Sequence, residues 1–238
     1  MNFVIPMAGK GQRFIDAGYK EPKMFIKAKG KTLLEWSLDS LPFELCSRLI
    51  FIALTEHETT WGISEFIKKK YSGKWELIIH FIDQTTQGQA ETVLKAESMI
   101  NKEEALLIFN IDTCFDSPTL KNQLIRTDID GVLGSFKDNS PRFSFAKTDS
   151  EGIVSFVTEK DPVSDNALTG LYFFSKANDF LETAKKCIEN DEKTKGEFYI
   201  APMYNKLIAN NKKYILDQCE KLFILGTPEE LDSFIKIS

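Results

Sequence analysis

The chain has 238 residues, of which 42% are hydrophobic and 27% are charged. At roughly 150 residues per domain, this length and apolar content predict a single domain with a large core, and they exclude a disordered or fibrous chain. The formal net charge of −5 argues against a protein that binds nucleic acid by bulk electrostatics, because such binding requires clustered Lys and Arg.

Short apolar runs rich in β-branched and aromatic residues recur through the first half and predict buried strands. They cover residues 3–5, 49–54, 77–82, 106–109 and 131–136. Helical patterns alternate with these runs. Thr32-x-x-Glu35 is typical of a capping box, and apolar stripes follow at Leu34, Leu38 and Leu41 and at Ala90, Val93, Leu94 and Ile100. We expect an α/β fold with a doubly wound, mostly parallel sheet, whose ligands bind beyond the carboxyl ends of the strands.

The second half has closely spaced strand-like runs at residues 143–147, 153–157 and 168–174, separated by turn residues. This spacing predicts a smaller mixed or antiparallel region. Helices are expected over residues 176–189 and 201–210. A last helix should begin at Thr227-Pro228, with Thr227 as the cap and Glu230 returning its hydrogen bond.

Cys46, Cys114, Cys187 and Cys219 form no C-x-x-C pair, so neither a zinc site nor a dense disulfide framework is indicated. The N-terminal sequence has no signal-peptide pattern, and the longest apolar run, residues 49–54, is too short to cross a membrane. We therefore expect a cytoplasmic protein with no membrane partner, as a monomer or a homo-oligomer.

A small-residue turn, Ala8-Gly9-Lys10-Gly11, follows the first strand and ends near Arg13. Glycines allow backbone N–H groups to approach a phosphate, and the cations add charge-assisted hydrogen bonds. The dinucleotide fingerprint is excluded because Phe14 stands where a third small residue is required. Glycine turns after a first strand are common in α/β proteins, so the turn alone leaves phosphate binding and a purely structural turn equally open.

Pro22-Lys23 follows ten residues beyond Arg13. With the glycine turn, it makes residues 4–41 resemble the nucleotidyltransferases that activate sugar phosphates, whose signature is G-x-G-x-R and a later P-K. The resemblance implies a Rossmann-like, GT-A-like fold in one domain, residues 1–238, with a nucleotide-binding half (1–135) and an acceptor-binding half (136–238). It also implies that Ala8, Gly9, Lys10 and Gly11 hold a nucleoside triphosphate and that Arg13 and Lys23 neutralise its phosphates. The alternative for Lys23 is an ordinary surface lysine.

A polar loop, residues 84–89, enters the second predicted helix. It resembles the base-recognition segment of the same family, which implies that Gln84 and the backbone of Gly88 read the nucleobase. The family often has one more residue between these two positions, which shifts Gln84. The alternative is a hydrophilic turn that caps a helix.

Asp112 follows the buried run 106–111 and is the strongest single candidate for a functional side chain. Mg²⁺ prefers one or two carboxylates together with phosphate oxygens, and the resemblance implies that Asp112 is the metal ligand. Many relatives carry a second metal-binding Asp just before a T-G-T-P segment, but the matching stretch of this chain, residues 223–227, is wholly apolar before Gly226. We expect Glu197, Asp217 or water to take the place of this second ligand. His57 and His80 are interpreted as loop and strand residues rather than ligands.

Thr158-Glu159-Lys160 resembles the E-K motif of the family, whose lysine grips the acceptor phosphate. Gly170 and Glu197 lie in segments that also resemble its acceptor half. The resemblance implies acceptor-binding roles for Glu159, Lys160, Gly170 and Glu197. A structural Glu-Lys pair on an exposed strand is the alternative.

Together these residues predict an Mg²⁺-dependent nucleotidyltransferase, with Arg13, Lys23, Asp112 and Lys160 as its catalytic residues. CTP is favoured, from resemblance to short cytidylyltransferases of capsule and cell-surface biosynthesis. The acceptor would be a sugar 1-phosphate or a small phosphorylated polyol or amino acid such as phosphoglutamine. A glycosyltransferase and a non-catalytic nucleotide-binding module are the alternatives. The only Asp-x-Asp, at Asp128 and Asp130, precedes a strand and is expected in a turn.

Overall fold

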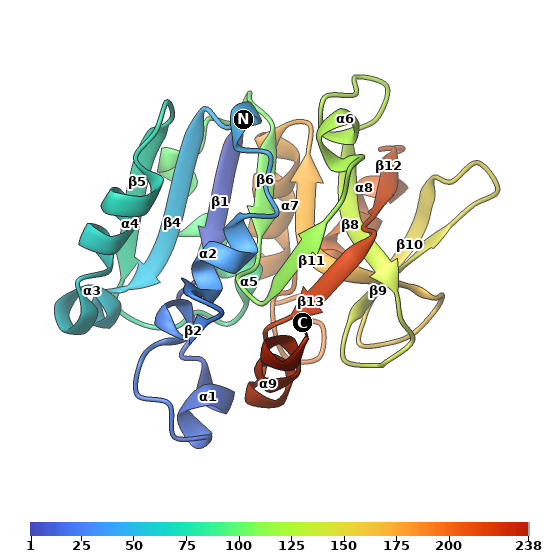
Figure 1. Ribbon diagram of the computed structural model, residues 1–238. Helices are drawn as coiled ribbons and strands as arrows, with labels where there is room; N and C mark the ends of the chain where they lie inside the picture. The colour runs from blue at the N-terminus through green and yellow to red at the C-terminus, as the bar shows by residue number, and fades with distance from the viewer. Residues whose placement is uncertain (238) are drawn as a thin grey trace.

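The computed structural model describes residues 1–237; Ser238, the last residue of the predicted domain, lies outside them. A nine-stranded sheet forms its centre (Figure 1). Its strands are β1 (Asn2–Pro6), β4 (Arg48–Leu54), β5 (Glu76–Ile82), β6 (Leu106–Phe109), β8 (Gly131–Lys137), β9 (Ser144–Thr148), β10 (Val154–Glu159), β11 (Asn166–Phe174) and β12 (Tyr214–Gln218). Every strand predicted from the apolar runs is present.

The first half of the sheet is parallel. Strand β1 pairs with β4 on one side and with β6 on the other, and β5 continues beyond β4. Because the chain passes from β1 to β4 and β5 and then returns to β6 on the opposite side, the strand order reverses beside β1. In open α/β sheets, ligands bind at such a reversal, beyond the carboxyl ends of the strands.

Both faces of the sheet are apolar and covered by helices. In β1, Val4 packs into the core on one face, whereas Phe3 and Ile5 pack into the core on the other. The helices are α1 (Gln12–Asp16), α2 (Leu33–Leu38), α3 (Thr55–Trp61), α4 (Ile63–Tyr71), α5 (Gln89–Leu94), α6 (Leu120–Leu124), α7 (Ala177–Glu189), α8 (Tyr204–Ala209) and α9 (Pro228–Lys236). The first core includes residues of α5 and α7, and the second includes residues of α2 and α4, so helices lie on both sides of the sheet (Figure 1). The predicted doubly wound α/β fold is confirmed.

The second half is mixed, as its sequence predicts. Strand β11 runs antiparallel to β6, β8 and β9, and the β9–β10 hairpin ends the sheet (Figure 1). The β8–β12 pair is parallel. A second small sheet joins β13 (Lys221–Ile224) to β7 (Thr113–Asp116), and a third joins β2 (Lys27–Ala28) to β3 (Lys31–Thr32). The apolar pattern did not reveal β7, β13, β2 or β3, because each has four residues or fewer and, unlike the equally short β6, none is apolar throughout.

A third, smaller core places α1 and α9 next to each other although they lie at opposite ends of the chain. It contains Phe14 from α1, Leu33 from α2, and Leu231 and Phe234 from α9. Phe14 is therefore a packing residue, which explains the large side chain that excluded a dinucleotide fingerprint at this turn. Both helices lie at the lower end of the view in Figure 1.

Three local expectations are wrong. The helix predicted to extend to Ile100 ends at Leu94 and gives way to a short 3₁₀ turn at Glu97–Met99. His57 lies in helix α3 and is buried, rather than in a loop. The Glu230 carboxylate accepts a hydrogen bond from the Gly226 amide rather than from Thr227, so Thr227 caps α9 without a full capping box.

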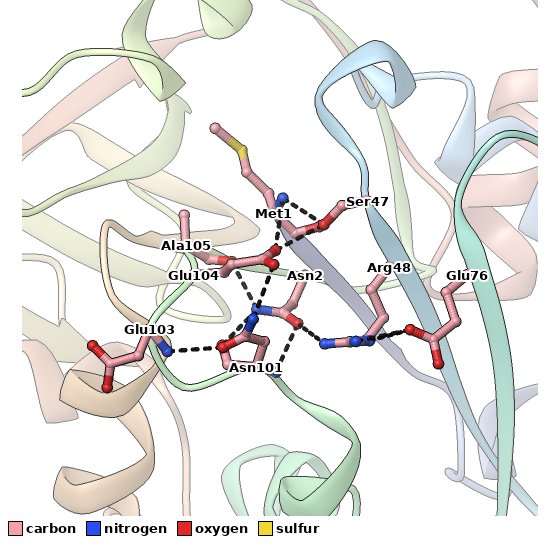
Figure 2. A network of polar contacts seen from close by, with 9 residues as sticks. All are labelled: Met1, Asn2, Ser47, Arg48, Glu76, Asn101, Glu103, Glu104 and Ala105. Atoms are coloured by element: carbon pink, nitrogen blue, oxygen red, sulfur yellow. Dashed lines mark hydrogen bonds and ion pairs between the residues drawn. The ribbon is translucent and has the colours of Figure 1, made fainter.

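A polar network holds the amino ends of three strands together (Figure 2). The Asn2 side chain is fully buried; it donates hydrogen bonds to the carbonyls of Asn101 and Ala105 and accepts one from the Asn101 amide. Arg48 also donates to Asn2 and forms an ion pair with Glu76 on β5. Since its buried polar groups are paired, the network is a structural contact.

Among the helices of residues 1–237, none combines the length and the apolar character needed to cross a lipid bilayer.

Candidate active site

A cavity of about 650 Å³ opens beyond the carboxyl ends of β1 and β6. Most of the predicted site residues line it: Ala8, Gly9, Gly11, Arg13, Lys23, Gly88, Asp112, Glu159, Lys160, Gly170 and Glu197. They come from segments that are up to 189 residues apart in the chain, from position 8 to position 197. The fold therefore brings both predicted halves of the site to one cavity.

Three residues named from the sequence lie apart from the residues that line the cavity. Lys10 and Gln84 are exposed, and neither is among the lining residues. Asp217 is buried on β12, where its carboxylate accepts hydrogen bonds from Ser117 and Thr119, both at 2.6 Å. Asp217 is thus a structural residue, and the suggestion that it replaces a second metal ligand is wrong.

Lys23 and Asp112 face each other across the cavity floor. Lys23 lies on a 3₁₀ turn, Lys23–Phe25, and its Nζ is 3.3 Å from Oδ2 of Asp112, which lies three residues beyond the end of β6. The Lys23 side chain is only 12% exposed, whereas that of Asp112 is 47% exposed. A lysine buried to this extent and paired with a carboxylate in a cavity is not an ordinary surface lysine.

The donor set at Asp112 is compatible with Mg²⁺ bound through a substrate. No group of three or more His, Cys, Asp or Glu side chains that could hold a metal is found within residues 1–237. Mg²⁺ usually keeps several waters and takes one or two carboxylates plus phosphate oxygens. The half-exposed Asp112 carboxylate supplies one such ligand, and a triphosphate would have to supply others.

The loop before α5 is joined by its backbone to a segment of the second half. The Phe198 amide donates to the Gln87 carbonyl at 2.9 Å, and the Ala90 amide donates to the Phe198 carbonyl at 3.0 Å. Gly88 lies between these bonds with φ of 149°, and a Cβ there would be 2.5 Å from the Phe198 nitrogen. Only glycine fits here, and the loop predicted to read the base is thereby fixed to the segment that carries Glu197.

Lys160 occupies the mouth of the cavity directly after β10. Its φ of 54° is unusual for a residue other than glycine. Its Nζ is 2.6 Å from the hydroxyl of Tyr199, and that hydroxyl is 2.9 Å from the Glu197 carboxylate. The hydrogen bond with Tyr199 raises the pKa of Lys160, so this side chain stays positively charged at neutral pH.

Glu159 is buried next to Lys160, with 5% of its surface exposed. Burial raises the pKa of its carboxyl group, and a hydrogen bond from Ser144 on the neighbouring strand β9 opposes this shift. Its side chain lines the same cavity. Glu159 is therefore placed to accept a hydrogen bond from a ligand in the cavity.

Two residues with no motif in the sequence also line the cavity. Arg142 lies in the loop before β9 and forms an ion pair with Glu230, at the first turn of α9. The sequence indicates Glu230 only as the partner of a helix cap, in Thr-x-x-Glu spacing, and Arg142 belongs to no spacing that predicts a binding site. The signal that was available is weak: a cation placed directly before a strand.

Asp128 and Asp130, the Asp-x-Asp of the alternative glycosyltransferase hypothesis, are not among the lining residues. Asp128 pairs with Arg126, and Asp130 pairs with Lys212 in the turn before β8. Neither carboxylate is available to a ligand in the cavity.

Comparison with known proteins gives a consistent family. The sequence pattern of the family described as "Nucleotidyl transferase" matches residues 3–219. Among solved structures, the nucleoside-diphosphate-sugar pyrophosphorylase from Vibrio cholerae RC9 has a TM-score of 0.84 and 32% identity, over 99% of this chain and 100% of that chain.

Two curated proteins are also similar. A 2-C-methyl-D-erythritol 4-phosphate cytidylyltransferase of Wigglesworthia glossinidia brevipalpis is 30% identical over 105 residues, which are 44% of this chain and 41% of the relative. The bifunctional protein GlmU of Methanococcus aeolicus is 27% identical over 216 residues, 89% of this chain and 48% of the relative. The chain thus spans less than half the length of either curated relative. Because the family pattern extends over most of the sequence and the V. cholerae structure is matched along its whole length, the chain belongs to the nucleotidyl transferase family.

Proposed function

We propose that the protein transfers a nucleotide from a nucleoside triphosphate to a phosphorylated acceptor. An oxygen of the acceptor phosphate forms a bond to the α-phosphorus, the bond between that phosphorus and the bridging oxygen to the β-phosphate breaks, and pyrophosphate leaves with the electron pair. The observation that carries the proposal is one cavity that has cations on both sides, with Lys23 facing Asp112 on one side and Lys160 on the other.

The catalytic problem in this reaction is repulsion between two anions. The acceptor phosphate is already a nucleophilic anion, so no side chain needs to be activated as a nucleophile. Positioning and charge neutralisation would supply most of the rate acceleration. Clustered cations from separate segments suit that task.

On the triphosphate side, the turn at Ala8, Gly9 and Gly11 would hold the phosphates through backbone N–H groups. Arg13 and Lys23 would neutralise their charge. Lys23 is already held in place by Asp112, which limits the reorganisation needed when a triphosphate binds. The backbone of Gly88, on the loop before α5, would contact the base.

Asp112 would be the protein ligand of an Mg²⁺ ion. When bound, this ion would neutralise charge on the triphosphate oxygens. Asp112 would also keep the Lys23 ammonium group in place beside the same phosphates.

On the acceptor side, Lys160 would bind the acceptor phosphate. Its ammonium group is oriented by Tyr199, which is in turn held by Glu197. Glu159 and Glu197 would accept hydrogen bonds from hydroxyl or amine groups of the acceptor, and Gly170 leaves room for Asn110 beside it. This half supports a small polar acceptor: a sugar 1-phosphate, or a phosphorylated polyol or amino acid.

We favour CTP as the nucleotide. The similarity to a cytidylyltransferase from W. glossinidia supports this choice. The four free cysteines are consistent with a reducing compartment, as expected for a cytoplasmic enzyme that makes activated precursors of cell-surface polymers.

The experiment is a product screen by mass spectrometry. The protein is incubated with Mg²⁺, with CTP, UTP, dTTP or GTP, and with a panel of sugar 1-phosphates, polyol phosphates and amino-acid phosphates. We expect a nucleoside-diphosphate-linked product with one pairing and most efficiently with CTP. Transfer of a sugar from a nucleotide sugar, or binding without any product, would instead support a glycosyltransferase or a non-catalytic module.

A further inference from the structure

One cation of the cavity has no role in the reaction proposed above. Arg142 forms an ion pair with Glu230, and its guanidinium carbon lies 4.6 Å from the centre of the Phe143 ring. The Arg142 side chain is 49% exposed, whereas that of Glu230 is 15% exposed. An ion pair with a half-exposed partner adds little to stability. Stabilisation of the fold therefore does not account for the Arg142–Glu230 pair.

Arg142 lies close to Lys160 because of the register of the β9–β10 hairpin. Ser144 on β9 pairs with Glu159 on β10, and the Lys160 amide donates to the Phe143 carbonyl at 2.9 Å. Arg142 and Lys160 therefore leave neighbouring strand ends and line the same cavity. Two cations that enter one cavity from neighbouring strand ends make a local anion site in a chain with a net charge of −5.

Glu230, the other member of the ion pair, lies near Asp112. Glu230 accepts a hydrogen bond from the Gly226 amide at 3.0 Å, and the Leu225 amide donates to the Asp112 carbonyl at 2.6 Å. The Arg142–Glu230 pair therefore spans the cavity from the Lys160 side to the Asp112 side. A phosphate that bridges these two sides would meet the Arg142 guanidinium.

We infer that Arg142 is a further binding residue for the acceptor phosphate, and that Glu230 is the carboxylate which this phosphate displaces. The planar guanidinium can bind a phosphate through two parallel hydrogen bonds, as it binds a carboxylate. When the phosphate replaces Glu230, Arg142 gives up one ion pair and gains another. Glu230 retains its hydrogen bond from Gly226 after the exchange. The inference rests on the proposed function.

The test uses two variants with opposite expected effects on the full chain. Arg142→Ala removes the cation, so the KM for the acceptor should rise at least tenfold, with little change in the KM for CTP. Glu230→Gln removes the competing charge but keeps an oxygen that can accept from the Gly226 amide, so the acceptor KM should fall several-fold. Arg142→Lys keeps the positive charge but loses the planar guanidinium group, so its acceptor KM should lie between those of wild type and Arg142→Ala. Pyrophosphate release is measured against each substrate in turn, with the acceptor found in the product screen, and circular dichroism reports folding.

An acceptor KM unchanged in Arg142→Ala would overturn the role of Arg142 while leaving the proposed function intact. An acceptor KM that rises in Glu230→Gln as it does in Arg142→Ala would show a structural clasp and would also overturn it. If Arg142→Ala fails to fold, the direction of the change in Glu230→Gln decides the matter alone. A wild-type protein that turns over no pair of substrates would contradict the proposed function itself.

Discussion

The two sides of the cavity, which would bind the nucleotide and the acceptor under the proposed function, are built in different ways. On the nucleotide side, Asp112 and the glycine turn follow the ends of β6 and β1, which are buried strands with an apolar core on each face. On the acceptor side, Lys160, Tyr199 and Glu197 are held by hydrogen bonds between side chains, near the end of the sheet. The difference indicates that strand order fixes the nucleotide half, whereas a few polar contacts fix the acceptor half. Acceptor preference could therefore change through few substitutions without disturbing the sheet.

The largest effect that tests this comparison is expected at Asp112. Asp112→Asn keeps the shape of the side chain but removes the charge that faces Lys23 and that would bind Mg²⁺. We expect a loss of hundreds-fold in kcat, since removing one preorganised electrostatic contact costs about 3 kcal/mol at the transition state. Pyrophosphate release measures the rate, and urea unfolding checks that the fold is intact. Asp128→Asn, an exposed aspartate away from the cavity, is the matched control; a wild-type rate in Asp112→Asn would refute the assignment.

At Gly88 the loop before α5 touches the segment that carries Glu197. In Gly88→Ala the new methyl group would overlap the Phe198 backbone, so the loop and the segment at Glu197 must separate. Relief of such a clash costs about 1 to 3 kcal/mol, and both the nucleotide KM and the acceptor KM should rise. Steady-state kinetics with each substrate varied in turn checks this.

Gly152 provides the control for that variant. It also has a positive φ, in the turn between β9 and β10, but a Cβ there has open space around it. Gly152→Ala should therefore lower stability slightly without changing either KM. If Gly88→Ala behaves in the same way, backbone strain rather than contact between the halves explains both.

The helix caps also differ between the two halves of the chain, with a smaller expected effect. Thr32 has a complete capping box with Glu35 in the first half, whereas Thr227 caps α9 alone because Glu230 is used at Gly226. We expect Thr32→Ala to lower the free energy of unfolding by about 1 kcal/mol and Thr227→Ala by less. Urea denaturation measures the loss of stability in each variant. A larger loss in Thr227→Ala than in Thr32→Ala would contradict the prediction.

The smallest expected effect concerns pH. Burial raises the pKa of Glu159 above its ordinary value of 4.5, so the folded protein binds this proton more tightly than the unfolded chain. Its contribution to stability is present below pH 4.5 and is lost as the pH rises through the raised pKa. Glu159→Gln should remove this loss, so the difference in urea midpoint between variant and wild type grows from pH 4 to pH 7. The exposed Glu151→Gln is the control, and a difference that does not depend on pH would refute the interpretation.

Most of the nucleotide half could be predicted from the sequence. Buried parallel strands are continuous apolar runs, and the residue after such a run must lie at the edge where ligands bind, which is how Asp112 was found. Lys10 and Gln84 are exceptions: other residues of their loops line the cavity, but these two side chains are exposed and are not among the lining residues. A loop sequence does not say which of its side chains turns inward.

The acceptor half was less predictable for a physical reason. Arg142 and Glu230 meet across 88 residues, through a hairpin register and a small core between α1 and α9. Tyr199 meets Lys160 across 39 residues. Neither the β9–β10 register nor that core, which takes only a few residues from each helix, has a periodic signal in the sequence. Asp217 shows that a carboxylate suggested as a metal ligand from the sequence can have a structural role instead. Its side chain accepts hydrogen bonds from Ser117 and Thr119.

The most direct test of the account is the initial rate of pyrophosphate release with Mg²⁺ and a triphosphate, measured with and without the phosphorylated acceptor. The convergence of cations from both halves on one cavity predicts that release requires both substrates and is lost in Lys23→Ala and in Lys160→Ala. Release from the triphosphate alone, or an undiminished rate in either variant, would contradict the claim that the two halves act on a single pair of anions.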